Sequence, residues 1–192
     1  MKTKIKLLKP FTDKCFGNFV DGAFWITDGH IALNTNFYDN IKLPKECEYF
    51  VKNRQVFAYQ NKAIVTDSVP DIAKIIPQGP RYILVKTSLI QEDINKRQTS
   101  IFYGHDRFVY LDKVFTDIIY NTPLIGDFNV LQNYDKPLGP VSFYSIHADI
   151  ETSKPCAIVS PMRQSDELER LLYGNLQDMT NTIDNERRKA IA

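Results

Sequence analysis

The sequence has no long apolar run. None of its 192 residues fall in an uninterrupted stretch of the roughly 18 to 20 apolar residues that a membrane span needs. The first residues, Met1 to Pro10, are too often interrupted by lysine to form a signal peptide. We therefore expect an intracellular, cytoplasmic protein that does not associate with membranes.

Cysteine and histidine are scarce. The three cysteines (Cys15, Cys47 and Cys156) are odd in number and widely spaced, which suggests neither a disulfide framework nor a zinc site. His105-Asp106 and the segment from His147 to Glu151 contain metal-ligand residue types. Both segments have the polar composition of turns, so we predict buried thiols and no metal site.

The familiar motifs of enzymes are missing too. The sequence has no glycine-rich phosphate loop, no G-x-S-x-G and no H-E-x-x-H. We predict a protein that is not an enzyme and binds no cofactor. A small enzyme of unfamiliar chemistry stays open as an alternative, because a Cys–His pair can form between distant parts of a chain.

Material for a folded core is plentiful. Hydrophobic residues make up 43% of the chain, with 12 Phe and 10 Tyr, and the length suits one large domain or two small ones. The formal net charge of +1 lacks the basic excess of a protein that grips phosphates tightly. A protein that merely surrounds DNA needs no such excess.

Short runs of β-branched and aromatic residues predict strands, and Asp28-Gly29 and Asn61-Lys62 predict hairpin turns. No internal repeat is visible. The predicted strands cover residues 23–27, 30–34, 55–59, 63–66, 81–85, 140–146 and 156–159.

Helical signals are fewer. Apolar residues three and four apart predict helices over residues 44–53, 88–96 and 109–120, the first two with proline or serine at the start. The C-terminal segment gives the clearest pattern, with Ser165 as the cap. Its apolar face comprises Leu168, Leu171, Leu172, Leu176, Met179 and Ile183. Strand pairs with single helices predict an α+β fold of antiparallel sheets plus a C-terminal helix.

Three separated segments resemble the bacterial sliding clamps, the processivity subunits of replicative DNA polymerases. Thr27-Asp28-Gly29-His30 is similar to the T-D-G-H-R-L segment of that family's middle domain. The segment Pro70 to Pro77, which reads PDIAKIIP, resembles the P-D-Y-x-x-V-(I/L)-P segment at the entry to its last domain. Ala157 to Arg163, which reads AIVSPMR, resembles the closing V-V-M-P-M-R.

The resemblance implies a DNA-clamp-like fold and a division of the chain. Residues 1–66 would form a shortened middle-type domain, residues 67–163 a last-type domain, and residues 164–192 a helical tail with no counterpart in the family. In clamps the three segments line a pocket that holds a partner's short extended peptide. The residues carried over to that pocket are Thr27, Gly29, His30, Pro70, Ile75, Ile158, Ser160, Pro161, Met162 and Arg163.

Two departures concern the specificity of this pocket. Ile31-Ala32 stands where the family has Arg-Leu, and Ser160 stands where it has methionine. The tail could cover a sheet edge, dimerise or lie over the pocket.

The function implied by the resemblance is that of a processivity factor. Its partners would be a DNA polymerase or another replication or repair protein, and double-stranded DNA without sequence specificity. The chain would be a homo-oligomer, with a two-domain chain closing a ring as a trimer. The alternative is a clamp-fold interaction module, of a phage or mobile element, that does not encircle DNA. The DNA contacts implied are Lys45, Lys52, Arg54, Lys96, Arg97 and Lys113.

Overall fold

The structure is a computed structural model, and it describes residues 10–38, 41–92, 96–122, 127–136 and 138–163. The described elements form an α+β fold that is mainly antiparallel sheet, which agrees with the predicted fold class. The N-terminal half contains α1 (Pro10–Asp13), β1 (Lys14–Val20), β2 (Ala23–Thr27), β3 (Ile31–Asn34), α2 (Lys45–Lys52), β4 (Phe57–Gln60) and β5 (Ala63–Val65). The C-terminal half contains η1 (Ile72–Ile75), β6 (Arg81–Glu92), β7 (Gln98–Gly104), β8 (Arg107–Asp112), α3 (Lys113–Tyr120), β9 (Phe128–Asn133), β10 (Val141–Ser145) and β11 (Ala157–Val159).

The two halves repeat one topology. In each, a three-stranded meander leads to a helix, and the next strand returns to pair with the first strand of the meander: β4 pairs with β1, and β9 pairs with β6. The eleven strands run in the order β5-β4-β1-β2-β3-β11-β10-β9-β6-β7-β8. All their pairings are antiparallel. This structural repeat is not visible in the sequence.

The pairing of β3 with β11 joins the two halves. Ile31 lies opposite Val159, Ala32 opposite Ile158 and Leu33 opposite Ala157. The sheet therefore runs without a break across the division predicted between residues 66 and 67, which falls in the connection between β5 and η1.

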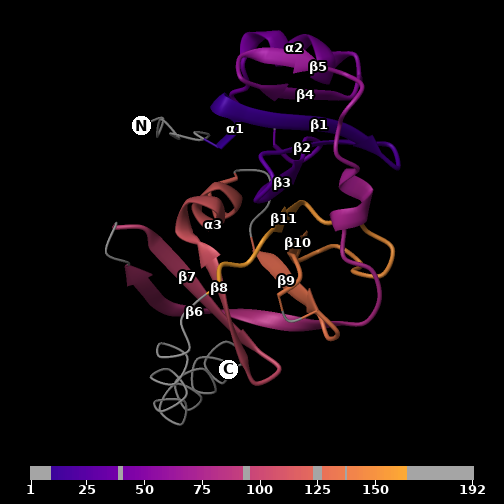
Figure 1. Cartoon of the computed structure of the whole chain (residues 1–192). Helices are drawn as coiled ribbons and strands as arrows, with labels where there is room; N and C mark the ends of the chain where they lie inside the picture. The colour runs from indigo at the N-terminus through magenta and orange to yellow at the C-terminus, as the bar shows by residue number, and fades with distance from the viewer. Residues whose placement is uncertain (1–9, 39–40, 93–95, 123–126, 137, 164–192) are drawn as a thin grey trace, which may run out of the picture.

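The main core lies on the face of the sheet that carries α2 and α3. Figure 1 shows α2 over the β4–β5 end of the sheet and α3 beside β7 and β8. Cys47 of α2 and Phe115, Ile118 and Ile119 of α3 belong to one apolar cluster that also contains Phe143 of β10. The opposite face of the sheet carries two smaller apolar clusters.

The α2 helix forms where it was predicted. Pro44 precedes it, and the Pro44 carbonyl accepts the first helical hydrogen bond from the Cys47 N–H at 2.9 Å. Cys47 is buried, and the half-buried Phe50 packs against Phe57 of β4 in a tilted arrangement with ring centroids 5.5 Å apart. The helix is thus held by its one apolar face.

The helix predicted over residues 88–96 is wrong. Its described residues up to Glu92 continue β6, which pairs with β7 through Ile90, Gln91 and Glu92 after an irregularity that begins at Lys86. Apolar residues such as Leu89 and Ile90 occur in strands as well as in helices. Pairing with β7 decides that this segment is a strand.

The helix predicted over residues 109–120 is half wrong. Residues up to Asp112 complete β8, and α3 begins only at Lys113, where the Asp112 carboxylate caps it by accepting from the Val114 N–H at 2.9 Å. Strand β8 is apolar on both faces, so its residues also satisfy a helical stripe. Strands β1, β7, β8 and β9 were not predicted as strands. The predicted tail helix lies outside the described residues.

Candidate functional site

The first of the three segments is a turn held by its own side chains. Asp28 Oδ1 accepts from the N–H groups of His30 (2.8 Å) and Ile31 (2.9 Å), and Thr27 Oγ1 accepts from the Gly29 N–H (2.9 Å). Gly29 has a φ of +101°, a conformation that favours glycine. Thr27 is buried, whereas Gly29 and His30 are exposed. The turn therefore presents the His30 side chain from a fixed backbone.

The second segment crosses the face of the sheet opposite the helices. The side-chain amide of Asn18 on β1 donates to the Pro70 carbonyl at 3.0 Å, and Asp71 caps η1 by accepting from the Ala73 N–H at 3.1 Å. Pro70 is exposed, and Ile75 is 38% exposed.

Ile72 fixes η1 to the sheet. It is 1% exposed and lies in an apolar cluster with Val20, Ala23, Trp25, Ala32 and Ile158, on which Ile76 also packs. We call this the η1 cluster. Ile158 belongs to the third segment and is one of the residues predicted to line the pocket. It is buried beneath η1 at the junction of the two halves.

The third segment continues the pairing of β11 beyond its last residue. The Ser160 N–H donates to the His30 carbonyl at 2.8 Å, and the Met162 N–H donates to the Tyr110 carbonyl of β8 at 2.8 Å. Pro161 and Met162 are half-buried, and Ser160 and Arg163 are exposed. Residues 160–162 thus bridge the β2–β3 turn and β8.

We call the ten predicted residues the candidate surface. Contacts join some of them, and others lie toward different strands. Contacts place the turn beside Ser160 and join η1 to Ile158 through the η1 cluster. Pro70 lies toward β1, where it contacts Asn18. Met162 lies toward β7, where its sulfur accepts from Thr99 Oγ1 at 3.7 Å. The arrangement is an elongated surface whose exposed apolar members are Pro70 and Ile75.

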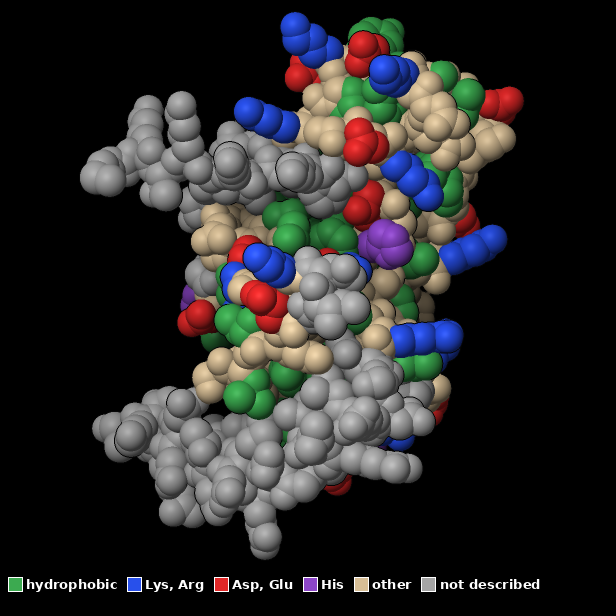
Figure 2. Space-filling view, turned by 60° about the vertical axis from the view of Figure 1, so that its left-hand side comes forward, with side chains coloured by type: hydrophobic (Ala, Val, Ile, Leu, Met, Phe, Trp, Pro, Cys, Tyr) green, Lys and Arg blue, Asp and Glu red, His purple; other side chains and the backbone are tan. Residues whose placement is uncertain are grey.

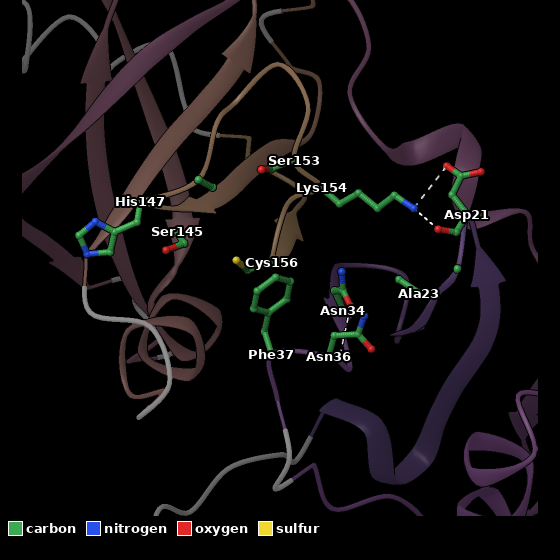
Figure 3. Close-up of a pocket in the computed structure, with 12 residues that line it drawn as sticks. Asp21, Ala23, Asn34, Asn36, Phe37, Ser145, His147, Ser153, Lys154 and Cys156 are labelled. Carbon is green, nitrogen blue, oxygen red and sulfur yellow. Dashed lines mark hydrogen bonds and ion pairs between the residues drawn. The ribbon is translucent and has the colours of Figure 1, made fainter.

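A cavity of about 470 Å³ lies at the other end of β2 and β3 and shares no residue with the candidate surface. Its lining includes Asn34, Phe37, Ser145, His147 and Cys156 (Figure 3). Sequence reasoning missed it, because its residues are ordinary turn and strand residues with no motif.

The Lys154–Asp21 ion pair, with Nζ and Oδ2 3.9 Å apart, borders this cavity and a second one of about 200 Å³ (Figure 3). The second cavity is lined by Ala73 and Ile76 at η1 and by Arg81 of β6. It flanks η1 on the side away from the β2–β3 turn.

All three cysteines are free and buried, as the sequence predicted. Burial raises the pKa of Cys47 and of Cys156 to about 11, and it raises the pKa of Cys15 still further. Thiols with raised pKa values carry little thiolate at neutral pH and are poor nucleophiles. Within the described ranges, no group of three or more His, Cys, Asp or Glu side chains is arranged to hold a metal ion.

The six basic residues predicted to contact DNA lie in two regions, one around α2 and one near the start of α3, where Arg97 binds Asp112. Lys45 and Lys52 are exposed at the two ends of α2, with Arg54 just beyond. Lys96 and Arg97 lie before β7, and Lys113 begins α3.

Carboxylates offset most of these charges. Lys113 Nζ lies 2.5 Å from Asp117 Oδ2, and Arg97 Nη2 lies 2.6 Å from Asp112 Oδ2. Helix α2 contains two glutamates, Glu46 and Glu48, beside its two lysines. Figure 2 shows blue and red side chains interspersed over the end of the molecule shown at the top.

No protein-family model matches this chain, and neither a curated protein nor a solved structure matches it significantly. Among the described helices, none has the length and apolar character to cross a membrane.

Proposed function

We propose that this chain is a non-enzymatic protein-interaction protein of the sliding-clamp kind, which captures an extended partner peptide on the candidate surface. One observation carries the proposal. The β3–β11 pairing continues through the Ser160–His30 hydrogen bond, while Ile72 packs η1 against Ile158. Three segments that are distant in sequence and share a resemblance to one family thereby reach a single face.

The chemistry of this surface suits a peptide with apolar anchors. Ile75, Pro161 and Met162 offer partly exposed apolar area, and methionine adapts its shape to the side chain that it meets. His30 and Arg163 add polar groups at the rim. The backbone beneath is fixed by hydrogen bonds, which lowers the entropy lost on binding.

The partner in this proposal is a DNA polymerase or another replication or repair protein that carries a short peptide motif. Two settings are compatible with such capture: a processivity factor that forms an oligomeric ring around DNA, and an interaction module that does not encircle DNA. The charges favour the second. Lysines of α2 and α3 are matched by acids, so these helices offer little net attraction to phosphates.

Peptide capture is tested by fluorescence anisotropy with a labelled, extended peptide that ends in Leu and Phe. Ile75→Glu places a charge in the apolar surface, and we expect it to weaken binding at least about tenfold, or about 1.4 kcal/mol. Val65→Glu on β5 is the matched control, because Val65 is 40% exposed and Ile75 is 38% exposed. Equal effects of the two substitutions, or no saturable binding by the unsubstituted protein, would refute the proposal.

The two settings are separated by binding to a short DNA duplex at several salt concentrations. A ring-forming clamp would sediment as an oligomer and would lose DNA affinity when Lys45 and Lys52 are both replaced by Gln. An interaction module would bind the peptide but show neither property. The pair Lys42→Gln and Lys62→Gln removes the same charge from other exposed positions and serves as the control.

A further inference from the structure

Strands β7 and β8 are apolar on both faces. On the face toward α3, Phe102, Val109 and Leu111 belong to the main core. On the opposite face, Ile101, Phe108 and Tyr110 form a second cluster and are only 3 to 8% exposed. Strands with near-continuous apolar residues belong to sheets that are covered on both faces.

Few described apolar residues pack on this second face. The partly buried residues that pack on the Ile101–Phe108–Tyr110 cluster are Leu89 and Tyr103, which belong to β6 and β7 themselves, and Met162. Among the described residues, Met162 is the member of this cluster that comes from outside the three strands. We call this surface the outer face of β6–β8. Ile83, also on β6, is 55% exposed.

Met162 is held at the outer face by two contacts. Its N–H donates to the Tyr110 carbonyl at 2.8 Å, and its sulfur lies 3.7 Å from Thr99 Oγ1 on β7. The last described residue, Arg163, therefore lies directly beside this apolar face.

We propose that residues 164–192 dock in cis on the outer face of β6–β8, with the apolar side of the predicted helix toward Ile101, Phe108 and Tyr110. Leu168, Leu171, Leu172, Leu176, Met179 and Ile183 recur at helical spacing after the exit point. As a helix, the segment would be about 40 Å long at 1.5 Å per residue. That length exceeds the roughly 23 Å of a seven-residue strand such as β7.

The tether favours this occupant over a second copy of the chain. A segment that begins two residues after Met162 has an effective concentration in the millimolar range at the outer face. Apolar contacts too weak to hold a separate molecule are then sufficient. The inference is argued from the cluster on β7 and β8 and does not depend on the proposed peptide capture, although Met162 belongs to both surfaces.

Hydroxyl-radical footprinting of the full-length protein tests the docking. The side chains read by mass spectrometry are Tyr103, Phe108 and Met162. Leu171→Asp with Leu172→Asp disrupts the apolar side of the segment, and we expect labelling of all three side chains to rise several-fold. Gln177→Asp with Asn181→Asp adds the same charge to the opposite side of the predicted helix and should leave the labelling unchanged.

Two results would overturn the proposal. Equal labelling of the three proteins would mean that the segment does not cover the outer face. Protection that weakens on dilution would show that a second copy is the occupant, because cis docking does not depend on protein concentration. Emission from Trp25, which lies in the η1 cluster away from β7 and β8, confirms that each variant is folded.

Discussion

The Ser160 N–H donates a hydrogen bond of 2.8 Å to the His30 carbonyl, one residue beyond the last pair of the β3–β11 ladder. This bond extends the seam between the two halves of the sheet to the β2–β3 turn. It fixes the position of His30 relative to Pro161 and Met162.

Ser160→Pro removes this donor while leaving the side-chain face little changed. We expect the free energy of unfolding to fall by about 1 kcal/mol, the usual net value of such a bond. Ser160→Ala keeps the N–H and is the control, with an expected change within about 0.5 kcal/mol for an exposed site. Urea unfolding followed by circular dichroism measures both. A Pro variant as stable as the Ala variant would show that the bond contributes nothing to the seam.

Ile72→Ala should loosen η1 from the sheet. Ile72 is 1% exposed, and truncation of such a buried isoleucine costs about 2–5 kcal/mol. Trp25, the sole tryptophan, is fully buried in the same cluster, so its emission should shift to longer wavelength as η1 loosens.

Ile75→Ala is the control for this substitution, because Ile75 lies on the same short helix but is partly exposed. Its stability and its Trp25 emission should stay close to those of the unsubstituted protein. An unchanged emission spectrum for Ile72→Ala would contradict the assigned packing.

Asp112→Ala should be more damaging than a surface substitution. The Asp112 carboxylate caps α3 at the Val114 N–H and pairs with Arg97, whose Nε and Nη2 lie 2.7 and 2.6 Å from Oδ2. Loss of the cap alone costs about 1 kcal/mol. We expect a loss of about 1 to 2 kcal/mol in urea unfolding, because the half-exposed ion pair adds up to about 1 kcal/mol to the loss of the cap.

Asp112→Asn separates the two contributions, since its side-chain oxygen can still cap the helix while the charge is lost. It should destabilise less than Asp112→Ala. If the two variants were equally stable, the cap would not be the main contribution.

The buried thiols predict a loss of stability at alkaline pH. The pKa of Cys156 is 9.0 in the reference state and is raised by burial to about 11 in the folded protein. Between these values the unfolded chain ionises and the folded chain does not. The contribution of the neutral thiol to the free energy of unfolding should therefore be complete below about pH 9. It should fall as the pH rises toward 11. Cys47, with a pKa of about 11, acts in the same direction.

Urea unfolding at pH 8 and pH 10.5 measures this dependence, and Cys156→Ala should show a shallower fall with pH than the unsubstituted protein. Thiol reagents at pH 8 should modify the folded protein slowly and the denatured protein at all three cysteines. Rapid modification of the folded protein would contradict the burial of the thiols.

Local signals in the sequence predicted a good part of the fold. The hairpin 23–34 follows from β-branched and aromatic residues around Asp28-Gly29, and α2 follows from Pro44 and the spacing of Cys47, Phe50 and Val51. Where a segment is apolar on both faces, as in β8, helical and strand spacing coincide. There the local pattern was insufficient.

The sequence by itself determined the turn at Asp28-Gly29, the buried cysteines, the start of α2 and the three segments that suggest a common site. Each rests on interactions between near neighbours or on side-chain hydrophobicity. Only the tertiary structure decided that β6 continues as a strand through Glu92, that β3 pairs with β11, and that Ser160 lies against His30. Those outcomes depend on backbone hydrogen bonds to partners far along the chain, which no local pattern of residues specifies.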